Sequence, residues 1–68
     1  QRLSRNELRI YDAVPLTSRG AAAEDIASRA GLTVALSVDI LVELEARGLV
    51  VRAGRHWRRG DAPPAPQE

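Results

Sequence analysis

The segment from Gly31 to Arg59 constrains the fold of this chain more than any other. Thr33 carries a hydroxyl that is suited to cap the N-terminus of a helix. The predicted helix runs from Thr33 to Arg47, and Gly48 follows where a left-handed helix terminator is favoured. A capped helix with a glycine stop is therefore expected at the centre of this segment.

Two short strands joined by a glycine turn are expected after that helix. Residues 49–52 have strand propensity, residues 53–55 supply the turn, and residues 56–59 return with the large aromatic Trp57. Few other small folds require a capped helix, a tight glycine stop and a hairpin in this order. The pattern is typical of the second half of a winged helix-turn-helix.

A first helix is predicted from a capping box near the start of the chain. The Ser4 hydroxyl is suited to accept from the Glu7 N–H, while the Glu7 carboxylate accepts from the Ser4 N–H. Leu3 and Leu8 flank this box as a hydrophobic staple. Pro15 is expected to close the helix.

A second helix is expected over residues 23–30, and residues 21–22 are expected to form a minimal strand that pairs with the hairpin. Helices two and three together then make the helix-turn-helix. Residues at helical and strand spacing are predicted to fill one core, namely Leu8, Tyr11, Val14, Ile26, Leu32, Leu41, Leu44, Leu49, Val51 and Trp57.

The predicted fold class is mainly α with a small β component, a winged helix-turn-helix made of a three-helix bundle and a β-hairpin wing. This domain is expected to cover residues 1–59. Residues 60–68 contain three Pro and no large apolar side chain, so they are expected to be a disordered Pro-rich tail. The chain begins at Gln1 rather than Met, which favours a piece excised from a longer protein.

Size and composition exclude several functions. A chain of 68 residues makes one small domain, with no room for a separate catalytic domain. It has no Cys, and its single His56 is not accompanied by the residues of a metal site or a Ser-His-acid set. No run of about 18 apolar residues is present to span a membrane. We therefore expect no enzyme activity, metal, cofactor or membrane anchor.

The positive charge is concentrated near the C-terminus. Residues 1–51 carry six Arg and seven acids, whereas residues 52–68 carry four Arg and two acids. All ten cationic residues are Arg, a bias that fits a GC-rich genome. Arg also binds planar anions in a bidentate manner, so the bias is compatible with nucleic-acid binding.

Helix three lacks the residues that read bases. Its N-terminal half, residues 33–39, contains no Arg, Lys, Asn or Gln, which are the residues that make bidentate contacts to guanine or adenine. Asp39 and Glu43 lie opposite the core side and would repel phosphate. The composition therefore disfavours sequence-specific reading of the major groove by this helix.

A second apolar row, Val34, Val38 and Val42, lies beside the core stripe of helix three. Two interpretations stay open at this point. The row is either the shoulder of the buried face or a surface for protein association.

The wing has the opposite chemistry. Its basic residues are candidates for phosphate contact, and they are Arg52, Arg55, His56, Arg58 and Arg59. The alternative is a solvated strand face without a ligand. Trp57 either closes the core beneath the wing or stacks on a base, and alternation along the strand places it opposite His56 and Arg58.

Several short motifs over residues 3–59 resemble the C-terminal winged-helix domain of the DNA-processing protein DprA (Smf) family. They are Ala13-Val14-Pro15, Ala23-Glu24-Asp25-Ile26-Ala27, Ala30-Gly31-Leu32-Thr33-Val34, Leu41, the run from Glu43 to Val50, and Trp57-Arg58. Many bacterial winged-helix regulators share the Leu-Glu-x-x-Gly-Leu-Val part, but the combination is more specific. Ser37 departs from the pattern, since it occupies a position that is usually apolar in winged helices.

The resemblance implies a cytoplasmic role in natural transformation, where the family protects incoming single-stranded DNA and helps to load the RecA recombinase. The main DNA and RecA contacts of the family belong to a Rossmann-like domain with no counterpart in these 68 residues. The winged helix is implied to be an accessory module, with weak nucleic-acid contact by the wing, protein association or self-association through helix three, or both. The alternative is the DNA-binding domain of a winged-helix transcription regulator.

Overall fold

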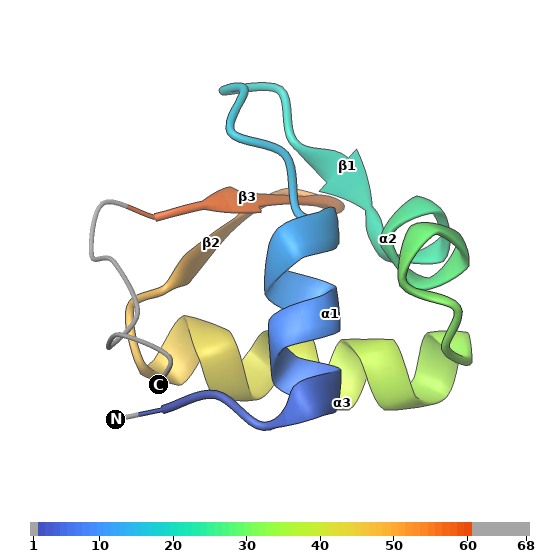
Figure 1. Ribbon diagram of the computed structural model, residues 1–68. Coiled ribbons are helices and arrows are strands. Elements are labelled where there is room, and N and C mark those ends of the chain that lie inside the picture. Colours follow the sequence, from blue (N-terminus) through green and yellow to red (C-terminus); the bar gives the residue numbers. More distant parts are fainter. Residues whose placement is uncertain (1, 61–68) are drawn as a thin grey trace.

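The computed structural model describes residues 2–60 and shows three helices with a small three-stranded antiparallel sheet (Figure 1). The elements in chain order are α1 (Arg5–Ala13), β1 (Ala21–Ala22), α2 (Ala23–Ala30), α3 (Val34–Ala46), β2 (Val50–Ala53) and β3 (His56–Arg59). The expected class, mainly α with a small β component, is confirmed.

Helices α1 and α3 begin where their capping residues predict, whereas α2 follows Ala22 without a side-chain cap. The Glu7 N–H donates to Ser4 Oγ at 3.2 Å and the Ser4 N–H donates to Glu7 Oε1 at 2.8 Å, so the capping box of α1 is complete. At α3, Thr33 Oγ1 accepts from the Leu36 N–H at 3.2 Å. These side chains satisfy backbone donors that have no partner within the helix.

The helices end at residues that cannot continue them. Val14, which precedes Pro15, caps α1 in an extended conformation, as steric contact with the proline ring favours. Gly31 follows α2 with a φ of 73°, and Gly48 follows α3 with a φ of 79°. This left-handed backbone costs an L-residue energy but costs glycine almost none.

The strands form a sheet with the order β1-β3-β2. Strand β2 pairs with β3 in an antiparallel hairpin in which Arg52 lies opposite Trp57. The minimal strand β1 pairs with the other edge of β3, with Ala21 opposite Trp57. The expected pairing of residues 21–22 with the hairpin is therefore confirmed.

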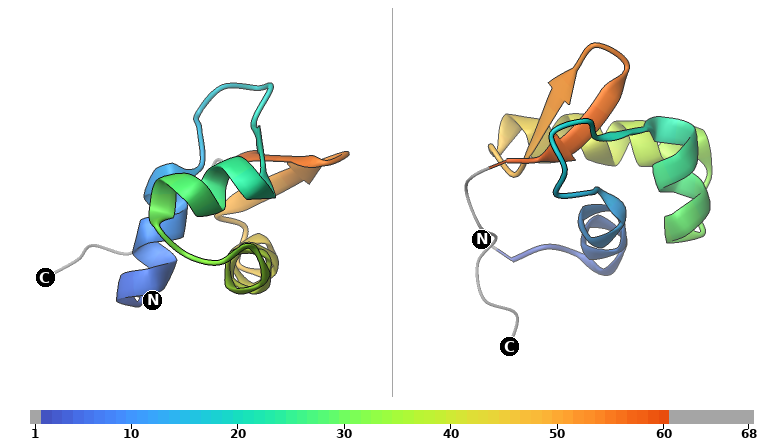
Figure 2. Two further views of the ribbon diagram at one scale, coloured as in Figure 1. Left: turned by 90° about the vertical axis from the view of Figure 1, so that its right-hand side faces the viewer. Right: turned by 90° about the horizontal axis from the view of Figure 1, so that it is seen from above.

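The hairpin extends past the helices on the side away from α1. In the left view of Figure 2, α1 lies on one side, α3 is seen end-on, and the turn between β2 and β3 projects beyond α3. The view from above agrees, because the turn again lies on the far side of α3 from α1. The hairpin and the outward side of α3 therefore share one side of the molecule.

One core joins all three helices to the sheet. Its buried hydrophobic residues are Leu3, Ile10, Tyr11, Val14, Ala21, Ile26, Ile40, Leu41, Leu44, Leu49, Val50 and Trp57. The prediction for Val51 was wrong, since Val50 is the buried strand residue and Val51 is half-buried. A strand alternates between two faces, and the pairing register gives Val50 the face of Trp57.

Two other core predictions need correction. Leu8 and Leu32 are only partly buried and pack against the core cluster from outside it. Ile10, which was not predicted, is completely buried on α1. The helical spacing identified the correct side of α1 but not the residue nearest its centre.

Ser37 lies in the core without an unsatisfied polar group. The side chain is completely buried, and its Oγ donates to the carbonyl oxygen of Thr33, one turn earlier, at 2.7 Å. A hydroxyl can make this bond within its own helix, so burial does not leave a polar group without a partner. The inward side of α3 accordingly comprises Ser37, Ile40, Leu41 and Leu44.

The last described residue belongs to the hydrogen-bonded structure. The Gly60 N–H donates to the carbonyl oxygen of Leu49 at 2.8 Å. A Cβ at Gly60 would lie 2.7 Å from the carbonyl oxygen of Gly48, so the close approach requires glycine. Gly60, the first residue of the predicted tail, is therefore bonded within the fold, and residues 61–68 lie outside the described residues.

Candidate nucleic-acid interface and association surface

The five basic residues predicted to bind nucleic acid do not form a single patch. Residues opposite each other in an antiparallel pair lie on the same face of the sheet, and successive residues alternate. Arg52 and Arg59 therefore share the bundle-facing side with buried Trp57, whereas His56 and Arg58 lie on the outer side. Arg55 lies in the turn and is exposed.

Arg59 is held by the end of α1. Its Nε donates to the carbonyl oxygens of Tyr11 and Val14, each at 3.1 Å, and its Nη2 donates to the carbonyl oxygen of Asp12 at 3.4 Å. The guanidinium also lies 4.4 Å from the centre of the Tyr11 ring. A cation at a helix C-terminus is favoured because the last carbonyls there have no partner within the helix. The donors of Arg59 are thus used within the fold.

Arg52, Arg55 and His56 are exposed, and Arg58 is half-buried. The only hydrogen bond that the Arg58 side chain makes within residues 2–60 is from Nη1 to the carbonyl oxygen of Arg59, at 3.5 Å. In that part of the chain, no acid lies within ion-pair distance of Arg52, Arg55 or Arg58. Their guanidinium groups are therefore available to an external anion.

Trp57 closes the core beneath the hairpin, as one of its two predicted roles requires. Its side chain is only 5% exposed. Arg52 lies above the ring, with Cζ at 6.0 Å from the ring centre, which is the outer limit for a cation–π contact. The ring surface is thus covered by protein and is not open to a nucleic-acid base.

Helix α3 exposes three large apolar side chains. Val34 is 44% exposed, Val42 is 51% exposed and Leu36 is also exposed, whereas Val38 is half-buried. The row Val34, Val38 and Val42 is thus exposed at both ends and half-buried in the middle. Exposed large apolar side chains on one helix are a feature of interaction sites.

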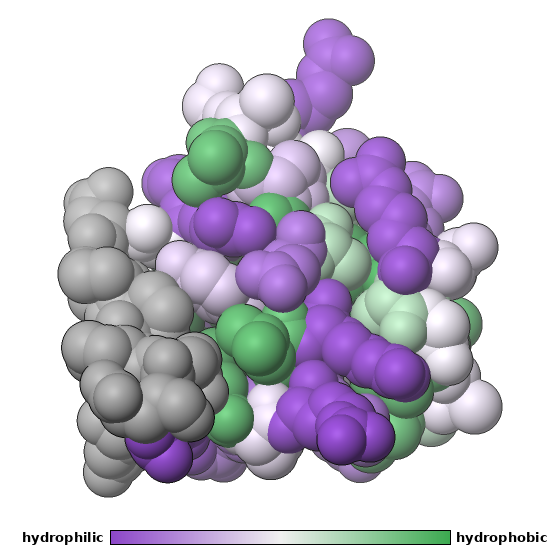
Figure 3. Space-filling view, in the orientation of Figure 1, coloured by the Kyte–Doolittle hydropathy of each residue, from purple (hydrophilic) through white to green (hydrophobic). Residues whose placement is uncertain are grey.

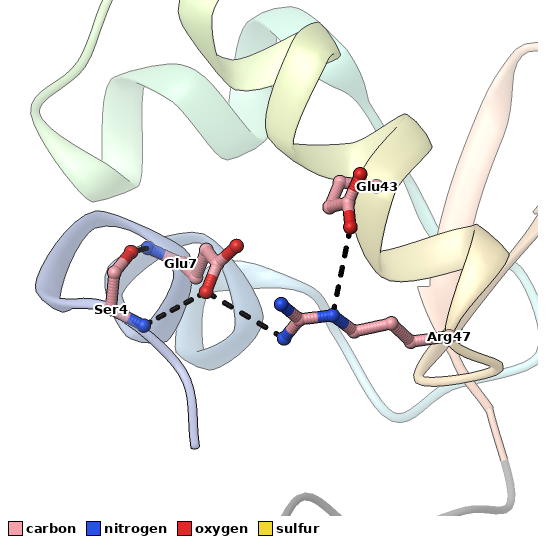
Figure 4. A network of polar contacts seen from close by, with 4 residues as sticks. All are labelled: Ser4, Glu7, Glu43 and Arg47. Carbon is pink, nitrogen blue, oxygen red and sulfur yellow. Dashed lines mark hydrogen bonds and ion pairs between the residues drawn. The ribbon is translucent and has the colours of Figure 1, made fainter. Parts of the chain in front are cut away.

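A polar network connects α3 to the start of α1 (Figure 4). Arg47 Nε lies 3.7 Å from Glu43 Oε2, and Arg47 Nη1 lies 3.7 Å from Glu7 Oε1. Glu7 therefore serves both the capping box and this ion pair. Glu43 lies one turn before Arg47 on the same helix, whereas Glu7, the second partner, is distant in sequence.

The remaining acids of α3 have no such partner. The helix contains Asp39, Glu43 and Glu45 but no Arg or Lys from Val34 to Ala46. Within residues 2–60 only Glu43 of these three lies within ion-pair distance of a cation. The exposed side of α3 therefore carries negative charge together with its apolar side chains.

A shallow open groove lies between the C-terminal ends of α1 and α2, lined by Arg9, Asp12, Ala13, Ser28, Arg29, Ala30 and Gly31. Hydrophilic residues are prominent on the face of the molecule that α1 presents (Figure 3). Two helix C-termini meet at this groove, and their partial negative charge offsets the two Arg side chains. The groove therefore lacks the net positive potential of an anion site.

Across residues 2–60, no group of three or more His, Cys, Asp or Glu side chains is placed to hold a metal ion. No helix in the same range is both long enough and apolar enough to cross a membrane. Comparison of the chain with protein-family models, curated proteins and solved structures found no match.

Proposed function

We propose that the domain is a winged helix and that it serves as an accessory module of a DprA-like DNA-processing protein. The β2–β3 hairpin is the wing, which contacts nucleic acid weakly and without regard to sequence. Helix α3 serves for protein association. The distribution of charge between these two elements carries the proposal.

The hairpin and α3 differ sharply in charge. Arg52, Arg55 and Arg58 have no acidic partner in the described part of the chain, whereas α3 has no cation at all. Cations that contact phosphate increase affinity by releasing counterions, and phosphate contacts carry no sequence information directly. A basic hairpin beside an acidic helix thus favours binding that is indifferent to sequence.

The arrangement of elements supports assignment to the winged-helix fold. Helices α2 and α3 follow each other through the short connection at Gly31, and the hairpin follows α3 and projects on its outward side. In DNA-binding helix-turn-helix proteins, the second helix of the pair enters the major groove. Here that helix is apolar and acidic, so its surface suits a protein better than DNA.

The assignment to DprA rests on the sequence motifs from Ala13-Val14-Pro15 to Trp57-Arg58. With it we propose a cytoplasmic location and a parent protein that handles single-stranded DNA and loads RecA during natural transformation. The full reading frame of the gene tests this assignment. A Rossmann-like domain upstream is the expected result, and an effector-binding domain would favour a transcription regulator instead.

Nucleic-acid binding by the hairpin is testable with a matched pair of double variants. Fluorescence anisotropy would measure the affinity for labelled single-stranded and duplex DNA of several sequences over a range of salt concentrations. Arg55→Ala with Arg58→Ala should weaken binding about equally for every sequence, and the salt slope should fall by up to roughly 2. Arg9→Ala with Arg29→Ala removes the same charge from α1 and α2 and should have little effect.

Two results would contradict the proposed binding mode. Equal losses in both double variants would show that net charge, rather than the hairpin, determines affinity. Tight binding to one duplex sequence that is insensitive to the hairpin substitutions but lost on changing Thr33 would show that α3 reads bases, as in a regulator.

A further inference from the structure

Helix α3 has apolar residues on two opposite sides. At 100° per residue, its inward side is centred near Leu44, and Val42 lies on the outward side between Asp39 and Glu45. Ala35 and Ala46 are exposed on the same side, so no bulky polar residue covers it. A helix that is apolar on most of its circumference is usually covered on all sides. The outward side of α3 is therefore expected to have a partner.

The hairpin of the same chain has the charge that such a partner requires. Asp39 and Glu45 have no ion-pair partner within residues 2–60, and neither do Arg52 and Arg55. Both elements lie on the side of the molecule away from α1 (Figure 2). One side thus presents an acidic, apolar strip next to a basic strip.

Two adjacent strips of opposite charge are complementary to themselves under a two-fold rotation. Rotation about an axis between the strips places α3 of each copy against the hairpin of the other, which is the geometry of an isologous dimer. We infer that this side is a self-association surface and that the partner of α3 is the hairpin of a second copy of the chain. The assignment rests on the association role proposed for α3, and it does not require the hairpin to bind DNA.

The two kinds of contact have different roles. Burial of Val42, with Ala35 and Ala46 beside it, against the second copy supplies the attraction, because removal of apolar surface from water is the main driving force of association. Pairing of Asp39 with Arg55 of the second copy fixes which elements meet, since charges at an interface contribute to specificity more than to affinity. The contact is small, so the dimer should be weak and in exchange with the monomer.

Self-association and nucleic-acid binding would then use the same arginines. Phosphates that bind Arg52 and Arg55 remove the partners of the acidic residues on α3. The addition of DNA should therefore dissociate the dimer, and a high concentration of the domain should weaken its apparent affinity for DNA.

Sedimentation equilibrium of the 68-residue chain at low salt, combined with charge-swap variants, tests the inference. Asp39→Lys and Arg55→Glu should each weaken self-association by at least about tenfold, since each places like charges together at both contacts of the dimer. An equimolar mixture of the two variants should associate about as well as the unmodified chain. One contact of the mixed dimer is unchanged, and the other has its charges exchanged.

Controls separate a specific contact from general effects. Arg9→Glu changes charge on α1 and should associate as the unmodified chain does, and its mixture with Asp39→Lys should associate no more than Arg9→Glu does alone. Val42→Asp should abolish the dimer, whereas Leu16→Asp changes a side chain that is 78% exposed in the loop after α1 and should leave the dimer intact. Circular dichroism of each variant would verify the fold.

A chain that stays monomeric at all accessible concentrations would overturn the inference. So would a dimer whose charge-swap mixture associates no better than either variant alone, because α3 would then not meet the hairpin. Neither result would alter the DNA titration, which is measured on dilute monomer and tests the proposed hairpin contact separately.

Discussion

Replacement of Arg59 by alanine should destabilise the fold by about 3 kcal/mol. Arg59 connects the last strand to the end of α1 through the carbonyl oxygens of Tyr11 and Val14. Hydrogen bonds that involve a charged donor contribute about 1.5–3 kcal/mol. Stacking on the Tyr11 ring adds roughly 0.5–1 kcal/mol, and the exposed ion pair with Asp12, at 3.9 Å, adds little.

A loss of this size is large for so small a domain. At roughly 0.05–0.15 kcal/mol per residue, a fold of this length has only a few kcal/mol of total stability. Each kcal/mol corresponds to about 4–8 °C in a domain of 60–100 residues, so the Tm of Arg59→Ala should fall by more than about 10 °C. Arg59→Lys should recover less than half of the loss, because an ammonium group cannot reproduce the planar fork or the stack.

Urea denaturation provides the measurement, with circular dichroism reporting the helices and Trp57 fluorescence reporting the core. The neighbouring substitution Arg58→Ala is the control, since Arg58 lies on the outer side and makes only a 3.5 Å hydrogen bond. It should change stability by less than about 0.5 kcal/mol. If Arg59→Ala costs no more than Arg58→Ala, the contacts with α1 do not stabilise the fold and the reasoning is refuted.

Two further predictions concern stability. Trp57→Ala should cost about 3–5 kcal/mol in thermal or urea unfolding, because a nearly buried indole leaves a cavity, and an unchanged transition would show that the ring is exposed in solution. Gly20 and Gly31 have almost the same positive φ, 72° and 73°. A Cβ at Gly20 would lie 2.5 Å from the carbonyl oxygen of Trp57, whereas a Cβ at Gly31 would meet no atom within 4 Å. Gly31→Ala should therefore cost about 1–2 kcal/mol, and Gly20→Ala should cost clearly more; equal losses in matched denaturation experiments would contradict the close approach.

Local chemistry in the sequence determined where the helices begin and end. Ser4 with Glu7, and Thr33 alone, bond to backbone groups within three residues, so their effect needs no knowledge of the rest of the chain. The positive φ at Gly31 and Gly48 is equally local. These signals are sufficient to predict three helices followed by a hairpin, and the structure confirms that order.

The tertiary structure decided which member of an apolar run is buried. Leu49, Val50 and Val51 have similar propensities, and only the pairing of β2 with β3 places Val50 with Trp57 on the bundle side. A shift of one residue reverses the face of every side chain in a strand. Likewise, the sequence predicted a core side for α3 but not the exposure of Val42, which depends on what packs beside it.

The arginines of the hairpin show most clearly what the sequence predicts and what only the tertiary structure decides. Composition and spacing identified Arg55, Arg58 and Arg59 as one group of candidate phosphate ligands. The structure separates them, because alternation directs Arg59 to carbonyl oxygens that lie 45 and 48 residues earlier in the chain. Hydrogen bonds between residues close in sequence can be predicted from the sequence itself. Whether an arginine bonds the last carbonyl oxygens of a distant helix or stays free to bind an external anion is decided only when the chain has folded.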